Sequence, residues 1–263
     1  MNKTISILGC GWLGFPTAKQ LIKNGYAVKG STTSEDKIKN FEEQGIIPYL
    51  ISLENLNSSK ISTFLNSEIL LIALPSKNID GFKKLIEAIN TSTIKKVIFI
   101  SSTSVYAEEN KIVTEKESLN PSALLEIENL FINNKQIETT VLRFAGLFGY
   151  NRKPGNFFMN GRIIPNPKGF VNMIHQDDCV QILLEIIYKQ ILGEIFNACA
   201  DTHPNRREYY IKVKKDIGNE APVFNETEKA PFKIVSNKKL KQFLNYSFKY
   251  PDLLKIDYNS PLI

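Results

Sequence analysis

Three glycines near the start of the chain have the spacing of a phosphate-binding turn. Gly9, Gly11 and Gly14 form a Gly-x-Gly-x-x-Gly pattern between an apolar segment at 5–8 and a helix-like segment at 15–24. In this pattern the first glycine permits a tight turn, the second lets the backbone approach a diphosphate, and the third lets helix and strand pack closely. The helix N-terminus then offers N–H groups to the phosphates. The pattern predicts a dinucleotide site, and the alternative is merely a tight turn between strand and helix.

The glycine-rich turn opens a chain in which strand and helix signals alternate. Strands are predicted at 5–8, 26–30, 46–51, 68–74, 96–101, 139–142 and 195–198. Helices are predicted at 15–24, 34–43 with Ser34 as its cap, 80–90, 122–133, and to about residue 188 from a cap at Asp177 or Asp178. This alternation predicts an α/β protein with a Rossmann-type doubly wound parallel sheet.

The composition changes after residue 143. Glycine and proline become frequent between 144 and 172, which is untypical of a sheet core. We therefore expect a dinucleotide-binding domain over 1–150 and a smaller C-terminal substrate lobe over 151–263, with 172–200 returning a helix and a strand to the sheet. The stretch from 204 to 263 predicts two helices followed by a loose tail.

Ligands of a doubly wound sheet bind at the carboxyl ends of the strands. The candidate cofactor-binding residues at these ends are Gly9, Gly11, Trp12, Leu13, Gly14, Ser31, Thr32, Thr33, Ala73, Leu74, Pro75, Ser101 and Ala145. NAD-specific sites usually carry a carboxylate at the end of the second strand, but the first acidic residues here, Glu35 and Asp36, fall in the next helix. Hydroxyl groups together with Lys37 suit a 2′-phosphate. NADP is therefore the favoured cofactor, and NAD is the alternative.

Three further segments carry motifs at or after strand ends. They read Ser-Ser-Thr-Ser-Val-Tyr at 101–106, Leu-Arg-Phe-Ala-Gly-Leu-Phe-Gly at 142–149, and Asn-Met-Ile-His-Gln-Asp-Asp at 172–178. In sequence and in order they resemble motifs of the extended short-chain dehydrogenase/reductase family, the group of sugar-nucleotide epimerases and dehydratases. The family's Arg-x-x-Gly-x-Tyr-Gly element has Phe148 here in place of its tyrosine. The resemblance covers most of the chain.

This resemblance implies a catalytic set of Ser or Thr, Tyr and Lys, in which the lysine lowers the pKa of the phenol that transfers the proton. Ser102 matches the Ser/Thr position. The Tyr-x-x-x-Lys pair is missing, because its expected positions hold Leu125 and Asn129. The pair formed by Tyr210 and Lys214 lies well past the sixth strand and is interpreted as a coincidence. The chain therefore resembles the atypical branch of the family, which keeps the cofactor fold without the full set.

Several residues are candidates for the missing chemistry. Tyr106 is the first, beside Ser102, and its alternative role is packing under the substrate lobe. A carboxylate of Glu126 or Glu128 in a desolvated cleft is a second candidate base, against the plainer reading of a helix surface. We interpret His175 as a structural hydrogen-bonding residue. Arg152 is the candidate partner of an anionic substrate group. With only two histidines, neither a Ser-His-Asp set nor a metal site is expected.

Bulk composition excludes several classes of protein. The net charge of +6 comes from scattered lysines, so no nucleic-acid surface is expected. The longest apolar run, near 69–74, is too short to cross a bilayer, and the first apolar segment lacks the features of a signal peptide. The three cysteines are isolated, which argues against disulfides and zinc and favours the cytoplasm.

Two functions from different classes remain. The first is an NAD(P)-dependent oxidoreductase or epimerase/dehydratase-like enzyme that acts on a small polar or sugar-linked substrate, with a homodimer as its expected assembly. The second is a non-catalytic NADP(H)-binding sensor or regulatory module. The retained glycine turn is compatible with both, and the missing Tyr/Lys pair favours the second.

Overall fold

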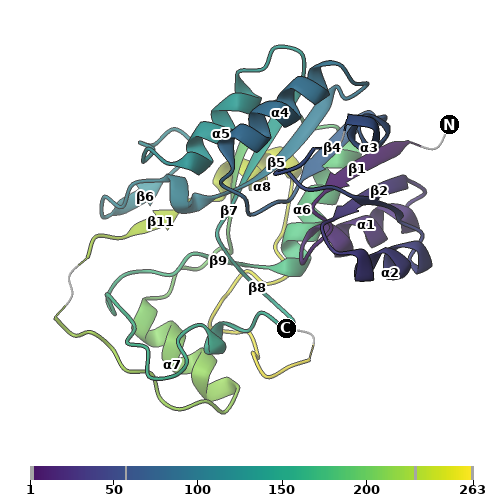
Figure 1. Cartoon of the computed structure of the whole chain (residues 1–263). Helices are drawn as coiled ribbons and strands as arrows, with labels where there is room; N and C mark the ends of the chain where they lie inside the picture. The colour runs from purple at the N-terminus through teal and green to yellow at the C-terminus, as the bar shows by residue number, and fades with distance from the viewer. Residues whose placement is uncertain (1–2, 57, 228–229, 262–263) are drawn as a thin grey trace. The chain divides into compact units, whose positions relative to one another are not determined.

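The computed structural model describes residues 3–56, 58–227 and 230–261. Its main feature is a seven-stranded sheet with the order β10-β7-β5-β4-β1-β2-β3 (Figure 1). The strands are β1 (Thr4–Leu8), β2 (Ala27–Thr32), β3 (Ile47–Leu50), β4 (Ile69–Ile72), β5 (Lys96–Ser102), β7 (Glu138–Phe144) and β10 (Ile195–Ala198). β1 runs parallel to β2 and β4, β2 to β3, and β4 to β5. All predicted strands are present, and the doubly wound sheet is confirmed.

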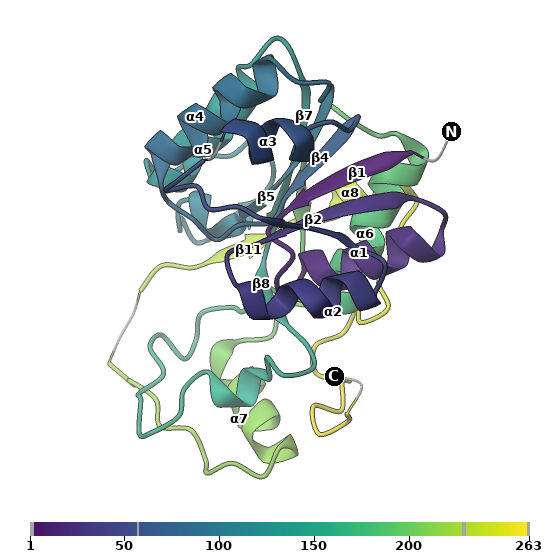
Figure 2. The ribbon, with the colours of Figure 1, turned by 45° about the vertical axis from the view of Figure 1, so that its right-hand side comes forward.

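Helices cover both faces of this sheet. The helices of the described residues are α1 (Gly14–Lys23), α2 (Ile38–Glu43), α3 (Ser58–Phe64), α4 (Ile79–Asn90), α5 (Ala123–Ile132), α6 (Gln176–Lys189), α7 (Arg206–Asp216), which belongs to the second unit described below, and α8 (Lys238–Leu244), with 3₁₀ turns η1 (Glu35–Lys37), η2 (Thr103–Val105) and η3 (Pro154–Asn156). Figures 1 and 2 show α4 and α5 together on one face and α1 and α2 on the other. The sequence does not predict α3, because its seven residues are mostly serine, threonine and β-branched or aromatic residues of modest helix propensity.

Two predicted helix caps are wrong. Ser34 precedes the 3₁₀ turn η1, and its hydroxyl donates to the Asp36 carboxylate instead of capping the backbone. α6 begins at Gln176, so Asp177 and Asp178 lie in its first turn and neither is the cap. In both places a side-chain hydrogen bond to another partner replaces the expected cap. Ser122, by contrast, accepts a hydrogen bond from the Leu125 N–H at 3.2 Å and caps α5 as predicted.

The chain forms two compact units. The first consists of Met1–Ser101, Asn120–Leu142 and Leu183–Ile195, and the second of Ser102–Leu119, Arg143–Ile182 and Phe196–Ile263. The predicted division into a dinucleotide-binding domain over 1–150 and a lobe over 151–263 stays a prediction. No helix in the described ranges is long and apolar enough to cross a membrane.

The core of the first unit lies between the sheet and the pair α4 and α5. Phe99 of β5 stacks on Phe131 of α5 with ring centroids 5.2 Å apart, and Phe82 of α4 meets both rings edge-on. All three rings are buried, and burial of each contributes roughly 1.5–3 kcal/mol. This packing fixes β5, whose carboxyl end carries candidate site residues.

The second unit contains two small parallel sheets and its own core. β6 (Lys111–Val113) pairs with β11 (Lys233–Val235), and β8 (Gly146–Phe148) pairs with β9 (Met173–His175). Its core residues are Phe148, Ile164, Val171, Met173, Ala200, Tyr209, Tyr210, Val213, Leu253, Ile256 and Tyr258.

The C-terminal segment from 246 to 258 is not a loose tail. It has neither helix nor strand, yet Leu253 and Tyr258 are 0% exposed. The Leu253 N–H donates to the Thr202 hydroxyl at 2.9 Å, and the Pro251 carbonyl accepts from the N–H groups of Asp201 and Thr202. The loose-tail prediction is wrong because long-range packing orders a segment whose local sequence favours no regular structure.

Candidate functional site

The glycine-rich turn leaves the sheet where the strand order reverses, between the neighbouring strands β1 and β4. Gly9 has a φ of +97°, and a Cβ there would lie 2.7 Å from the Ala73 carbonyl oxygen. Its N–H donates to the Ser31 hydroxyl at 2.8 Å, and the Ala73 N–H donates to the Leu8 carbonyl at 2.8 Å. Only glycine suits this position, and the contacts fix the turn to both neighbouring strands.

The other two glycines have different roles. A Cβ on Gly14 would clash with the Gly9 carbonyl, so this glycine provides the close packing of α1. A Cβ on Gly11 would meet nothing within 4 Å. The first turn of α1, which is described in full, has no acidic side chain, and its N-cap residue Leu13 makes no side-chain capping bond. An uncapped helix end beside a bare backbone fits a diphosphate.

The end of β2 divides into a supporting part and an exposed part. Ser31 is buried, and its hydroxyl supports the turn at Gly9. The Thr32 hydroxyl accepts a hydrogen bond from the Ser34 N–H at 3.1 Å. Thr33 and Lys37 are exposed. Of the side chains predicted to bind a 2′-phosphate, those of Thr33 and Lys37 are therefore the ones that a cofactor can reach.

The ends of β4 and β5 differ in accessibility. Ala73 and Leu74 are half-buried and Pro75 is exposed. Ser101 is buried, and its hydroxyl donates to the Glu128 carboxylate of α5, which is 0% exposed. Because this pair lies in the core of the first unit, Glu128 has no solvent path to a substrate and does not fit the role of a base.

Ser102 is the last residue of β5 and is half-buried. Its hydroxyl oxygen accepts the Ser104 N–H at 3.1 Å, which begins the turn η2. The bond uses Ser102 only as an acceptor. Its O–H therefore keeps the capacity to donate to a ligand oxygen.

Tyr106 belongs to the second unit and is 0% exposed. Its hydroxyl donates to Asn197 Oδ1 and accepts from Arg143 Nη1, both at 2.7 Å, and the guanidinium stands 5.0 Å from the ring centroid. Burial raises the pKa of the Tyr106 phenol, although the charge of Arg143 opposes this. A proton-transferring base needs the opposite shift, so the geometry supports the packing role and not the catalytic one.

The substitution Tyr106→Phe separates these two roles. We expect it to lower the free energy of unfolding by about 1–3 kcal/mol, because the buried Arg143 and Asn197 groups lose their partner. NADPH affinity should stay within about twofold of the wild type. Denaturant unfolding and calorimetric titration measure both quantities. An unchanged stability together with lost turnover would restore the catalytic role.

The two motif segments predicted after residue 142 lie side by side. β8 and β9 pair in parallel, with Phe148 opposite His175. Ala145 is buried, and its N–H donates to the Ala198 carbonyl at 2.9 Å. Arg152 is exposed on a tight turn, closed by two backbone hydrogen bonds with Gly149. Of these residues, only Arg152 offers its side chain to the surface.

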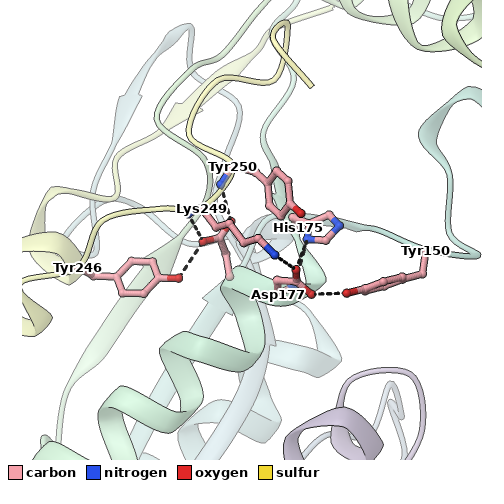
Figure 3. Close-up of polar contacts among 7 residues, drawn as sticks. Tyr150, His175, Asp177, Tyr246, Lys249 and Tyr250 are labelled. Atoms are coloured by element: carbon pink, nitrogen blue, oxygen red, sulfur yellow. Dashed lines mark hydrogen bonds and ion pairs between the residues drawn. The ribbon is translucent and has the colours of Figure 1, made fainter. Parts of the chain in front are cut away.

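A polar network follows β9, at the start of α6 (Figure 3). The Asp177 carboxylate accepts from the Tyr150 hydroxyl and from Lys249 Nζ, each at 2.7 Å. The Asp177 N–H donates to His175 Nδ1 at 3.1 Å. His175 is 0% exposed, and burial lowers its pKa to about 4. It is a neutral, structural hydrogen-bonding residue, which confirms the interpretation of the sequence.

Tyr150 does not replace the missing catalytic tyrosine. It is 39% exposed, but its hydrogen bond to Asp177 raises its pKa to about 12. Tyr210, also considered from sequence, lies in the core of the second unit, and burial raises its pKa as well. Neither phenol has the lowered pKa that base catalysis requires.

Asp178 holds the C-terminal segment, a role that the sequence does not reveal. Its carboxylate accepts from the Tyr246 hydroxyl at 2.8 Å and from the N–H groups of Lys249 and Tyr250 at 2.7 and 3.1 Å. Burial raises the pKa of Asp178 despite these bonds. The sequence signal was the adjacent pair of aspartates, which local reasoning assigned to a helix cap.

The strand order and the glycine-rich turn define a dinucleotide-binding protein of the short-chain dehydrogenase/reductase type. Two family models agree with this class: the NAD binding domain of 6-phosphogluconate dehydrogenase matches residues 4–124, and the NAD dependent epimerase/dehydratase family matches residues 71–199. The chain belongs to the NAD dependent epimerase/dehydratase family.

Individual relatives extend over nearly the whole chain. Protein YeeZ of Escherichia coli (strain K12) is 30% identical, and the match covers 96% of this chain and 98% of that protein. A solved structure of a functionally unknown conserved protein from Silicibacter pomeroyi has a TM-score of 0.79 at 20% identity, covering 99% and 98% of the two chains. UDP-glucuronic acid 4-epimerase from Bacillus cereus, in complex with NAD, has a TM-score of 0.77 at 21% identity, covering 97% of each. The two solved structures share the fold.

Proposed function

We propose that the protein is an NAD(P)-dependent oxidoreductase or epimerase/dehydratase-like enzyme acting on a small polar or sugar-linked substrate. One observation carries the proposal: Gly11 presents bare backbone with open space beside the uncapped N-terminus of α1. Family membership supports it, as does the fold shared with an NAD-bound epimerase. A small-molecule substrate, a homodimer and a cytoplasmic location belong to the same proposal.

Each part of the chain has a distinct task in this proposal. The N–H groups at Gly11 to Gly14 hold the diphosphate, and Thr33 with Lys37 receives a 2′-phosphate, which favours NADP over NAD. A bound nicotinamide supplies hydride transfer. The Ser102 hydroxyl donates to the substrate oxygen, as the family resemblance implies. Arg152 is the proposed partner of a negative group on the substrate.

Titration and turnover test the proposal together. We expect calorimetry to show binding of NADPH, more weakly of NADH, and a panel of carbonyl compounds and nucleotide sugars to reveal turnover. Ser102→Ala should then lower kcat about tenfold or more while leaving NADPH affinity unchanged, because a donor to the reacting oxygen is lost. Ser104→Ala, an exposed serine on the same turn, is the matched control. Unchanged kcat in the Ser102 variant would show that the catalytic site has been misplaced.

A second candidate function is a non-catalytic NADP(H) sensor. The observation in its favour is that α5, which reads Ala-Leu-Leu-Glu-Ile-Glu-Asn-Leu-Phe-Ile, has neither tyrosine nor lysine. Its buried Glu128 is bonded to Ser101 and offers no replacement base. NADPH binding without turnover on any substrate of the panel, together with a partner protein whose affinity responds to NADPH, would favour the sensor.

A further inference from the structure

All five arginines of the chain belong to the second unit: Arg143, Arg152, Arg162, Arg206 and Arg207. The first unit, which carries the glycine-rich turn, has lysines as its only strongly basic side chains. Arginine presents a planar fork of donors that suits phosphate and carboxylate oxygens. Any anion site built from arginine side chains therefore lies in the second unit.

Two of these arginines lack an acceptor. Within the described residues, neither the Arg162 nor the Arg206 side chain has a recorded hydrogen bond or ion pair, and Arg206 Nε is buried without an acceptor. Their neighbour Arg207 differs, because its Nη2 contacts both carboxylate oxygens of Glu226 at 2.6 and 2.5 Å. A buried guanidinium N–H without an acceptor is rare and calls for a partner. The contrast singles out Arg162 and Arg206.

Aromatic rings hold both guanidinium groups without neutralising them. The Phe158 ring centroid lies 5.6 Å from the Arg162 Cζ and 5.8 Å from the Arg206 Cζ. Arg206 also stands 5.8 Å from the Tyr210 ring, which meets Phe158 edge-on at 5.0 Å. Stacking on a ring leaves the donors at the edge of a guanidinium available. The guanidinium groups of Arg162 and Arg206 therefore both lie next to the Phe158 ring.

The backbone around Arg206 is fixed as well. Arg206 is the first residue of α7, and its N–H donates to the Gly169 carbonyl at 2.7 Å. Asn205 Oδ1 caps the helix by accepting the Glu208 N–H at 2.9 Å. The Glu208 carboxylate, the nearest acid along α7, accepts from Asn205 Nδ2 at 3.5 Å and pairs with neither arginine. The positive end of the helix dipole adds to the attraction for an anion.

We infer that Arg162 and Arg206, held by the rings of Phe158 and Tyr210, form an anion-binding site in the second unit for a phosphate or carboxylate group. The site itself depends only on these contacts. That the anion is part of the substrate rests on the proposed function. The substrate class would then be small polar molecules that carry a phosphate or a carboxylate.

The test uses the full chain, with inorganic phosphate and malonate as separate probes. We expect calorimetry to show saturable binding of at least one probe to the wild type, and the stronger probe identifies the source of the anion as phosphate or carboxylate. Arg206→Gln should weaken that binding about tenfold, and Arg162→Gln by about threefold or more. Arg207→Gln is the matched control, because it removes the adjacent arginine that already has a carboxylate partner, and its affinity should equal that of the wild type.

Three results would overturn the inference: no saturable binding of either probe, full binding by Arg206→Gln, or an equal loss in Arg207→Gln. Should Arg206→Gln fold poorly by circular dichroism, Arg206→Lys replaces it, and weakened binding is again expected because the planar fork is lost. NADPH titration of the same proteins separates this inference from the proposed function. Lost phosphate or malonate binding with normal NADPH binding refutes only the anion site, and the reverse pattern refutes only the dinucleotide assignment.

Discussion

Gly11→Val is expected to weaken NADPH binding about a hundredfold while leaving the thermal unfolding midpoint within about 2 °C of the wild type. A Cβ at this position meets no protein atom within 4 Å, so the side chain fits the fold. It would instead fill the space through which a diphosphate approaches the backbone. A hundredfold loss corresponds to about 2.7 kcal/mol. Calorimetric titration and differential scanning fluorimetry measure the two quantities.

Gly14→Ala provides the contrasting variant. Its Cβ would clash with the Gly9 carbonyl, so this smaller substitution should lower the unfolding midpoint by several degrees. The two variants together separate a loss of binding from a loss of folding. Wild-type affinity for NADPH in Gly11→Val would remove the dinucleotide site from this turn.

The stability of the protein is expected to fall by on the order of 3 kcal/mol as the pH is lowered from 6.5 to 4, because of His175. Burial holds the pKa of His175 at about 4 in the folded protein, against an ordinary value of 6.5. Between these values the unfolded chain binds more protons than the folded one, so stability rises with pH. The contribution is fully present above 6.5 and is lost as the pH falls toward 4.

Two neighbouring carboxylates change the size of this loss of stability, but the loss between pH 6.5 and 4 still comes from His175. Asp178 has a raised pKa because of burial, so it opposes the trend above its ordinary value of 3.8. Asp177 has a lowered pKa, and it weakens the fold only at still lower pH. His175→Asn, whose Oδ1 can accept the Asp177 N–H, should therefore flatten the dependence. Urea unfolding at pH 4.5, 5.5 and 7 measures it, and parallel curves for both proteins would contradict the prediction.

The sequence predicts best what depends on local pattern. The apolar run at 69–72 predicts β4, and the glycine spacing at 9–14 predicts the turn that follows β1. Both are patterns of residues close together in the chain, so the sequence shows them directly. The sequence also predicts a hydroxyl-rich end of β2, although of the residues predicted to receive a 2′-phosphate only Thr33 and Lys37 are exposed. The presence of a strand can thus be predicted from neighbouring residues, whereas the exposure of each side chain to a ligand cannot.

The contacts that the sequence does not reveal are long-range. Tyr106 was considered for catalysis because it follows Ser102 in the chain, but its partner Asn197 lies 91 residues away. Asp178 was assigned to a helix cap, although its partners Tyr246, Lys249 and Tyr250 are 68 to 72 residues distant. Glu128 appeared as a surface carboxylate because its burial depends on packing against the sheet. Composition and periodicity carry no information on such pairings.

The interleaving of the two units limits how this protein can change. The chain passes from one unit to the other five times, after Ser101, Leu119, Leu142, Ile182 and Ile195. A single crossover between related genes therefore cannot exchange one unit without part of the other, since no single break in the chain separates the two units. A change confined to one unit therefore has to arise by substitutions within it and not by one exchange, and the two units are inherited together.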